Sequence, residues 1–269
     1  MTRSKSIQVW PWSAATGSAP KKVMDLIAEE PLSVRVQGQP YMVVMRTPGD
    51  ELAHAAGLCL AEGLIHDPAD IAQLAFCDGA DTNTVTVTLQ EDCARRLDHM
   101  GDRRAYISQT GCGLCGKELI EDLHTAIKPL DDQVAVTIAA AASALSLLHR
   151  QQPLREQTRA AHAAALHDGQ GHLLVAAEDV GRHNALDKVI GRLFLDRKLP
   201  EAAMVILSSR ISYELVQKAA CARIPIIVAV SRPTALAVAL AERLNITLAS
   251  RRPENGLWVY SGASRLQMA

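Results

Sequence analysis

The sequence predicts an α/β fold, in which helices pack on a largely parallel sheet. In the last third of the chain, short apolar runs alternate with amphipathic helical segments. This β–α–β–α–β order is typical of parallel strands joined by right-handed crossovers, with helices on the faces of the sheet. Aromatic residues make up only 3% of the chain, although 48% of it is hydrophobic. The core must therefore consist mainly of Ala, Leu, Val and Ile, which suits helices packed closely on a sheet.

Length and charge exclude several classes of protein. The 269 residues suffice for one large domain or two modest ones, and the formal net charge is −1. A disordered chain would carry fewer apolar residues and a larger net charge. A dedicated nucleic-acid-binding protein would carry a strongly basic surface. We therefore expect no nucleic-acid partner and only local contacts with phosphate.

We expect a cytoplasmic protein with no membrane partner. Residues 1–23 include basic residues but no apolar segment of the length that a signal peptide needs. The longest mostly apolar stretch, 134–148, is interrupted by Thr and Ser and is too short to span a bilayer. The six cysteines, at positions 59, 77, 93, 112, 115 and 221, form no disulfide framework in a chain of this length. Reduced thiols are expected.

The sequence divides into three regions, and we expect few helices and strands in the first two. Residues 1–30 are rich in Ser, Lys and Ala and are expected to form a partly ordered lead-in. Residues 31–130 form an N-terminal region that carries the two closely spaced cysteines. Within it, a period-two pattern around Gly38-Gln39-Pro40 predicts a β-hairpin over 32–45. The other elements expected there are a helix that Thr47-Pro48-Gly49-Asp50 opens and that reaches about Leu60, and a strand at 84–89.

Residues 131–269 form the third region, an α/β unit that the family resemblance described below implies is the cofactor-binding region. It begins with a helix over 134–150 and a hairpin with strands at 162–166 and 172–177. A helix then runs from Gly181 to about Leu195, with apolar residues every three or four positions. The alternating elements that follow are strands at 204–207, 224–230 and 246–248, and helices at 213–223 and 233–244. Glu214 and Lys218 are expected to pair one turn apart.

The most specific chemical signal is Thr110-Gly111-Cys112-Gly113-Leu114-Cys115-Gly116-Lys117. A structural zinc site needs four ligands, but the other cysteines are scattered and the histidines at 162, 167 and 172 lie far downstream. The His-x-Glu or Cys-x-Glu and Pro-Cys-x-x-Cys segments of zinc deaminases are absent, as are the aromatic residue and proline of thioredoxin-like sites. The flanking glycines favour a loop that can visit two partners, and Arg103, Arg104 and Lys117 favour a thiolate. A sulfur relay through a persulfide fits best, and a loop without function is the alternative.

Two further segments could bind an anion. Gly181 stands at a strand-to-helix turn whose free amides suit an anion, and Arg182 and His183 add donors. Ligands in open α/β sheets bind outside the carboxyl ends of strands. The strand at 204–207 is followed there by a third segment, Ser208-Ser209-Arg210, and the strand at 224–230 by Ser231-Arg232-Pro233-Thr234. Ordinary helix capping explains both segments equally well. The residues expected at the nucleotide site are Val230, Ser231, Arg232, Pro233, Thr234 and Ala235.

Together these segments resemble the FdhD family of sulfur carrier proteins, which are sulfurtransferases required for formate dehydrogenase activity. The matching stretches occur in the family's order across roughly residues 30–261, at 45–49, 61–65, 111–117, 178–191 and 208–235. The most specific are Cys-Gly-x-Cys-Gly and Asp-Val-Gly-Arg-His-Asn-Ala-Leu-Asp-Lys. The family often has Thr-Gly-Gly-x-His-x-Ala before the hairpin, where this chain has Thr158-Arg159-Ala160-Ala161-His162.

The resemblance implies a three-layer core similar to that of cytidine deaminases, without their zinc site, and a smaller N-terminal hairpin and helix region. It implies that Cys112 carries the persulfide, that Cys115 assists or resolves it, and that a cysteine desulfurase supplies the sulfur. The bound substrate would be the cofactor molybdenum bis(molybdopterin guanine dinucleotide), which then enters the formate dehydrogenase catalytic subunit. The protein would hold no metal ion of its own and would form a homodimer. A non-catalytic chaperone that binds and inserts the cofactor is the alternative.

Overall fold

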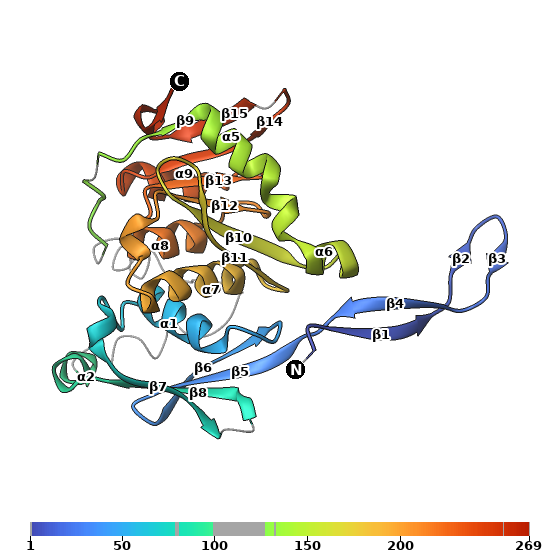
Figure 1. The fold of residues 1–269 in the computed structure, drawn as a ribbon, viewed down its shortest axis with the longest axis horizontal. Helices are drawn as coiled ribbons and strands as arrows, with labels where there is room; N and C mark the ends of the chain where they lie inside the picture. The colour runs from blue at the N-terminus through green and yellow to red at the C-terminus, as the bar shows by residue number, and fades with distance from the viewer. Residues whose placement is uncertain (1, 79–80, 99–126, 132, 255, 269) are drawn as a thin grey trace.

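The body of the molecule contains two large sheets with helices between them and on the outer face of the larger sheet, and a β-ribbon extends from it (Figure 1). A six-stranded sheet forms the C-terminal half and a four-stranded sheet lies on the N-terminal side. The computed structural model describes residues 2–78, 81–98, 127–131, 133–254 and 256–268.

The six-stranded sheet has the order β11-β10-β12-β13-β14-β15. Its strands are β10 (His162–His167), β11 (Leu173–Asp179), β12 (Met204–Leu207), β13 (Ile226–Ala229), β14 (Thr247–Arg252) and β15 (Gly256–Ser261). The central strands β12, β13 and β14 run parallel, which confirms the predicted alternating unit. The predicted hairpin, β10 and β11, joins the same sheet through an antiparallel contact with β12. The sequence did not predict β15, which pairs antiparallel with β14.

Helices cover both faces of this sheet. On one face α5 (Ile138–Leu147) packs over Met204, Ile206 and Val228. On the other, α7 (Arg182–Leu195), α8 (Tyr213–Cys221) and α9 (Ala235–Arg243) share a core with Val205 and Leu207. Successive residues of β12 thus face opposite cores, because side chains alternate along a strand. The result is a mixed α/β fold with helical layers on both sides of the sheet.

Two helix starts differ from the sequence prediction. Pro233 lies before α9 and not in its first turn, because Thr234 is the N-cap residue and its Oγ1 accepts a hydrogen bond from Ala237 N at 3.2 Å. Asp50 precedes α1 (Glu51–Ala61) with φ 61° and makes no capping hydrogen bond. Its carboxylate instead contacts Arg192 on α7.

The four-stranded sheet has the order β6-β5-β8-β7. β5 (Glu30–Val36) and β6 (Gln39–Arg46) form the predicted hairpin, and β8 (Asp81–Leu89) contains the predicted strand. The sequence did not predict β7 (Ile71–Asp78) or α2 (Glu91–Asp98). The smaller elements are α6 (Pro153–Thr158), β9 (Val136–Thr137), β16 (Leu266–Gln267) and the 3-10 turns η1 (Pro68–Asp70), η2 (Leu148–Gln151), η3 (Leu199–Glu201) and η4 (Ala263–Arg265).

The two halves join where α1 packs against α7. A Cβ atom at Gly191 would collide with the carbonyl of Ala53, and one at Gly57 with the carbonyl of Asp187. The absence of side chains at both glycines therefore allows the two backbones to approach closely. This contact places the segment before α1 beside the turn that begins α7.

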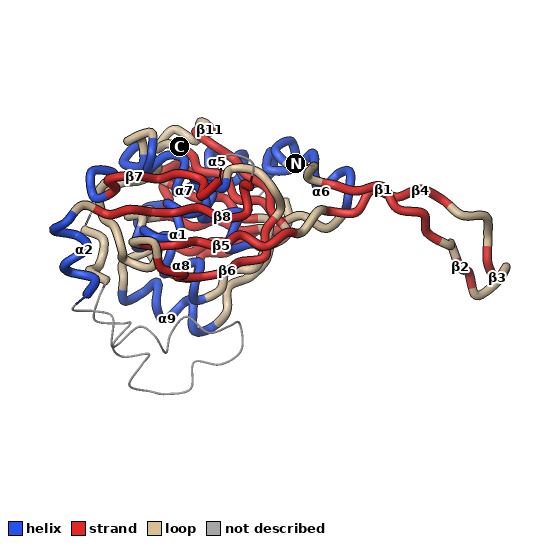
Figure 2. The backbone as a smooth tube through the Cα atoms, turned by 90° about the horizontal axis from the view of Figure 1, so that it is seen from below, coloured by secondary structure: helices blue, strands red, loops and turns tan. Residues whose placement is uncertain are grey.

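Residues 4–27 form a long ribbon, where the sequence predicts only a partly ordered lead-in. β1 (Ser4–Val9) pairs antiparallel with β4 (Lys22–Ile27), and β2 (Trp12–Ser13) with β3 (Gly17–Ser18) at the tip. Figures 1 and 2 show the ribbon standing away from the body. In the register of β1 and β4, Ile7 lies opposite Met24 on one face, and both side chains are about half exposed. The ribbon is therefore amphipathic, with its apolar face uncovered in the single chain.

No helix in the described ranges is long and apolar enough to cross a membrane.

Candidate functional site

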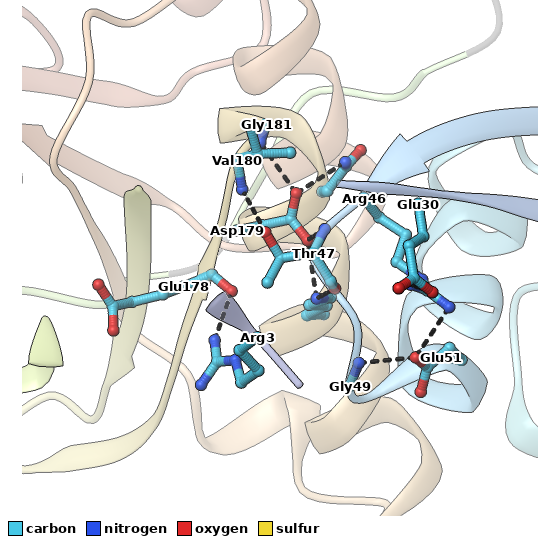
Figure 3. Close-up of polar contacts among 12 residues, drawn as sticks. Arg3, Glu30, Arg46, Thr47, Gly49, Glu51, Glu178, Asp179, Val180 and Gly181 are labelled. Carbon is cyan, nitrogen blue, oxygen red and sulfur yellow. Dashed lines mark hydrogen bonds and ion pairs between the residues drawn. The ribbon is translucent and has the colours of Figure 1, made fainter. Parts of the chain in front are cut away.

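Asp179, at the end of β11, organises the turn into α7 (Figure 3). Its fully buried carboxylate accepts hydrogen bonds from Thr47 N at 3.0 Å, Gly181 N at 2.9 Å and Asn184 Nδ2 at 2.9 Å. It also lies 2.7 Å from Lys188 Nζ, which donates at 2.7 Å to the carbonyl of Thr47. These contacts fasten the strand-to-helix turn to the segment before α1.

A second buried ion pair lies beside the first, because Asp187 directly precedes Lys188 on α7. Lys218 Nζ lies 2.8 and 2.9 Å from the two carboxylate oxygens of Asp187. The spacing along α8 predicted that Lys218 would pair with Glu214. In the structure Lys218 pairs instead with Asp187 on α7. Asp179, Asn184, Asp187 and Lys188 are thus used in contacts within the fold. The polar residues of this segment that remain for a ligand are Arg182 and His183.

His54 on α1 is fully buried beside these pairs, and neither ring nitrogen has a hydrogen-bond partner among the described residues. Burial, with a smaller contribution from the positive charges of Lys188 and Lys218, holds the pKa of His54 well below its usual value. The imidazole is therefore neutral in the folded protein at neutral pH.

Arg46, at the end of β6, is also fully buried and lies 3.1 Å from Glu51 Oε1 and 3.6 Å from Glu30 Oε2 (Figure 3). It donates a hydrogen bond to Asn83 Oδ1 at 2.8 Å. These contacts bind β5, β6, β8 and the start of α1 together. The polar core between the two sheets is therefore mostly paired and structural.

Arg182 and His183 are partly exposed and take no part in this network. His183 Nε2 lies 3.3 Å from Ser212 Oγ and 3.7 Å from Glu214 Oε2. The contact with His183 lowers the pKa of Glu214 to about 2. The first turn of α7 therefore meets the loop that follows β12, at the carboxyl edge of the parallel strands.

The loop after β13 lies along that same edge. Val230 N donates to the carbonyl of Leu207 at 2.9 Å, and Thr234 N donates to the carbonyl of Ile211 at 3.0 Å. A parallel bridge joins Ile211 to Pro233. The structure thus brings together the three sequence-predicted polar segments, 181–183, 208–210 and 230–235.

The hydroxyl groups at this edge are not equally available. Ser208 Oγ accepts a hydrogen bond from Ala163 N at 2.8 Å, and Ser209 is buried and donates to the carbonyl of Arg210 at 2.9 Å. Thr234 caps α9 through its oxygen, so the capping interpretation holds there, although its hydroxyl proton can still be donated outward. Ser231 is exposed and makes no side-chain hydrogen bond within the described ranges. Ser231 and Thr234 are therefore the hydroxyls best placed for a ligand.

Cys112 and Cys115 lie outside the described residues. Of the cysteines that the structure describes, Cys59 is buried, and this burial raises the pKa of its thiol to about 12, so it stays protonated and unreactive. Within the described ranges no group of three or more His, Cys, Asp or Glu side chains could hold a metal ion.

Two cavities lie away from this edge, beside α5 on the opposite face of the larger sheet. One, of about 350 Å³, is bounded by α5 and the β14–β15 hairpin, and the other, of about 270 Å³, by α5, β10 and β11. None of the predicted site residues lines either cavity.

The fold and this edge define a class: a mixed α/β protein with a polar edge at the carboxyl ends of its parallel strands, the place where open α/β sheets commonly bind ligands. The model of the FdhD/NarQ family matches residues 27–267. The chain therefore belongs to the FdhD/NarQ family, and the resemblance is confirmed.

Named relatives extend over nearly the whole chain. The sulfur carrier protein FdhD of Xanthomonas campestris pv. campestris (strain B100) is 38% identical over 256 residues, which cover 94% of this chain and 89% of the relative. The sulfur carrier protein FdhD of Streptomyces coelicolor is also 38% identical, over 90% of this chain and 89% of its own. A crystal structure described as a formate dehydrogenase accessory protein, from Desulfotalea psychrophila, superimposes with a TM-score of 0.78 at 25% identity, over 99% of this chain and 100% of that one.

The departure at Arg159 has a backbone explanation. Arg159 follows α6 with φ 60°, a left-handed conformation that favours glycine, and glycine is the residue the family often has there. The turn is thus kept with an arginine at some conformational cost. His162, which the departure leaves in place, begins β10 at the same polar edge of the sheet.

Proposed function

We propose that this protein is a sulfurtransferase that serves formate dehydrogenase. It accepts sulfur from a cysteine desulfurase as a persulfide on Cys112 and transfers it to the molybdenum cofactor before insertion into the formate dehydrogenase catalytic subunit. The observation that carries the proposal is membership of a family whose relatives are named sulfur carrier proteins. The Gly-flanked pair Cys112 and Cys115 supplies the required thiols, in a cytoplasm that keeps them reduced.

The chemistry balances with these two thiols and one external reductant. The Cys112 thiolate attacks the outer sulfur of the desulfurase persulfide, and the desulfurase cysteine leaves as a thiolate. The Cys115 thiolate then attacks the inner sulfur of the Cys112 persulfide, which forms a Cys112–Cys115 disulfide and releases the outer sulfur as sulfide to the cofactor. The sulfur gains two electrons and the two cysteines lose them, so a dithiol reductant must restore the pair.

The alternative, a non-catalytic chaperone, would hold the cofactor at the polar edge and use the thiols only for structure or a metal. The two functions separate in a strain that lacks its own family member. Cys112→Ala is expected to abolish formate dehydrogenase activity, with the protein folded and present at normal amounts. Cys77→Ala, at an exposed cysteine of β7, is the matched control and should restore full activity. Full activity with Cys112→Ala would contradict the sulfur relay and favour the chaperone.

We also propose that the guanine nucleotide portion of the cofactor binds along Val230–Ala235, with the hydroxyls of Ser231 and Thr234 as donors. The convergence of three polar segments at this edge supports the site. Each hydrogen bond to a charged ligand contributes roughly 1.5–3 kcal/mol. Replacement of both hydroxyls by alanine should therefore weaken GDP binding, measured by calorimetry, by well over tenfold.

Thr137→Ala is the matched control for the lost helix cap. Thr137 caps α5 as Thr234 caps α9, by accepting a hydrogen bond from Ala140 N at 3.1 Å, but α5 lies on the other face of the sheet. The control should lose about 1 kcal/mol of stability without loss of GDP affinity. Unchanged GDP affinity in the folded Ser231→Ala, Thr234→Ala variant would contradict the proposed site.

We propose, finally, that the protein is a homodimer in which the ribbon contributes to the interface. The exposed apolar face with Ile7, Met24 and Leu26 supports this, because an isolated two-stranded ribbon is marginally stable in water. Light scattering should give the mass of a dimer for the parent and the mass of a monomer for the double variant Ile7→Ser, Met24→Ser. Val23→Ser, on the opposite face of the ribbon, is the control and should stay dimeric. A monomeric parent at micromolar concentration would contradict the proposal.

A further inference from the structure

The cavity of about 270 Å³ between α5, the 3-10 turn η2 and the β10–β11 hairpin lies apart from the polar edge. His167, the last residue of β10, lines it and pairs with Met204, the first residue of β12. The cavity is therefore near the amino ends of the parallel strands, on the face of the sheet that α5 covers. Ala144 and Ala165 line its floor, and both are almost fully buried. Their short side chains leave space between the helix and the sheet.

His167 brings an unsatisfied polar atom to this floor. The residue is only 6% exposed, and its Nδ1 atom has no hydrogen-bond partner in the described part of the chain. Burial lowers the pKa of His167, so the imidazole is neutral at neutral pH. A buried polar atom without a partner is unfavourable, and a ligand that bonds to it offsets that cost. A hydroxyl group suits Nδ1 in either tautomer of the ring, because a hydroxyl both donates and accepts.

The rim of the cavity carries a positive charge. Arg150 in η2 is exposed, lines the cavity and forms no ion pair with any residue that the structure describes. No acidic side chain among the described residues lines the cavity. Leu147 and Leu173, which are 40% and 42% exposed, lie along the same opening. Because a guanidinium binds a carboxylate in a bidentate manner, the rim suits an anionic group attached to an apolar body.

The turn between β10 and β11 holds the wall of the cavity in place. The carboxylate of Asp168 accepts hydrogen bonds from Gln170 N at 2.9 Å and from His172 N at 2.8 Å. Gly171 has φ 87°, a conformation that favours glycine, and a Cβ atom there would lie 3.0 Å from the Cβ atom of Ala140 on α5. The turn therefore packs directly on α5, and the cavity is formed before any ligand binds.

We propose that this cavity binds a small organic acid with one apolar ring and a hydroxyl group opposite its carboxylate. The carboxylate pairs with Arg150 at the rim, the hydroxyl bonds to His167 Nδ1 at the floor, and the ring lies against Ala144 and Ala165. A cavity of roughly 150 Å³ holds a benzene ring, so the larger space here suits a ring with both substituents. A rigid ring also keeps the two polar groups apart with little loss of conformational entropy. The site does not depend on the proposed sulfur relay or on the proposed nucleotide site.

Calorimetry on the full chain tests the site with 4-hydroxybenzoate as the probe, and with benzoate and phenol as compounds that each lack one polar group. The parent should bind 4-hydroxybenzoate roughly tenfold or more tightly than either. Arg150→Gln should weaken the binding of 4-hydroxybenzoate and benzoate by roughly ten- to a hundredfold and leave phenol binding unchanged. His167→Phe, which keeps a ring at the floor, should bind 4-hydroxybenzoate no more tightly than benzoate.

Arg243→Gln is the matched control, because Arg243 is an exposed arginine at the end of α9, on the other face of the sheet. It should bind 4-hydroxybenzoate as the parent does. Arg150 is exposed, so its variant should fold and keeps the test decisive even if His167→Phe does not fold. Unchanged affinities in folded Arg150→Gln would overturn the proposal, and so would a folded parent that binds none of the three compounds at millimolar concentration.

Discussion

Asp179 and Lys188 form a buried ion pair in the C-terminal half, and both partners hydrogen-bond to the backbone of Thr47 in the N-terminal half. The two partners should not be equally sensitive to substitution. Removal of one partner of a buried pair costs about 3–5 kcal/mol, because the other charge stays buried. In Lys188→Met the carboxylate of Asp179 keeps three hydrogen bonds, from Thr47 N, Gly181 N and Asn184 Nδ2, so we expect a loss near 3 kcal/mol. In Asp179→Asn these donors lose a charged acceptor and Lys188 keeps only the carbonyl of Thr47, so we expect a loss near 5 kcal/mol.

Urea unfolding followed by circular dichroism measures both losses. The double variant should be less destabilised than the sum of the single variants, because the two groups interact directly. Arg192→Ala, which removes the half-exposed pair of Arg192 with Asp50, is the control and should cost less than about 1 kcal/mol. A loss for Lys188→Met no larger than that of Arg192→Ala would refute the structural role of the buried pair.

Two further predictions concern the same junction. Gly191→Ala should destabilise the protein by about 2–3 kcal/mol, because its Cβ would collide with the carbonyl of Ala53 and separate α1 from α7. Gly169→Ala is the control and should be nearly neutral, because nothing lies within 4 Å of its Cβ position. Equal unfolding midpoints for the two variants would contradict the close approach of α1 and α7. Stability should also fall with pH below about 6.5, because His54 is held neutral in the folded state while the unfolded state takes up a proton; at pH 5.5 this one group should cost about 1.4 kcal/mol relative to pH 7.5. His54→Gln should reduce that slope by one proton, and an unchanged slope would show that His54 titrates normally.

Local patterns predicted much of the C-terminal half of the fold. The sequence predicted the first and last residues of α7 from Gly181 and from the apolar spacing of Leu186, Val189, Ile190 and Leu193. Both signals are local, because the residues that start the helix and those that form its buried face are close together in the sequence. The pairing of Lys218 could not be predicted in the same way. Its partner Asp187 lies on another helix, and a spacing of four residues indicates only which side chains share a face.

The ribbon was mispredicted for a different reason. A local strand pattern is present in residues 4–9, but the composition of residues 1–30 was given more weight. Ser6, Ile7, Gln8 and Val9 alternate between polar and apolar residues, a pattern typical of a strand. The many Ser and Lys residues indicated a lead-in with little order, although the strand at 22–27 completes the pair. A hairpin whose connection is twelve residues long gives no compact turn signal.

For the candidate site, the sequence predicted the parts but not their arrangement. The segments around Gly181, Arg210 and Ser231 were each identified from strand ends and donors, yet capping explained each equally well. Their convergence depends on backbone contacts such as Val230 N to the carbonyl of Leu207, which only the sheet order creates. In the segment 178–188, Asp179 and Lys188 are buried by contacts with Thr47, while Arg182 and His183 point outward. The sequence could not predict this division, because Thr47, just before α1, lies more than a hundred residues away.

Mass spectrometry of the thiols tests the central claim, sulfur transfer through Cys112, most directly. The full chain is incubated with a cysteine desulfurase and cysteine, free thiols and persulfides are alkylated, and the peptides are compared between the parent and Cys115→Ala. We expect the Cys112 peptide to gain the mass of one sulfur atom, and to retain it longer in Cys115→Ala, which lacks the resolving thiol. A Cys112 peptide that gains no sulfur, in a folded protein and with an active desulfurase, would contradict the persulfide relay.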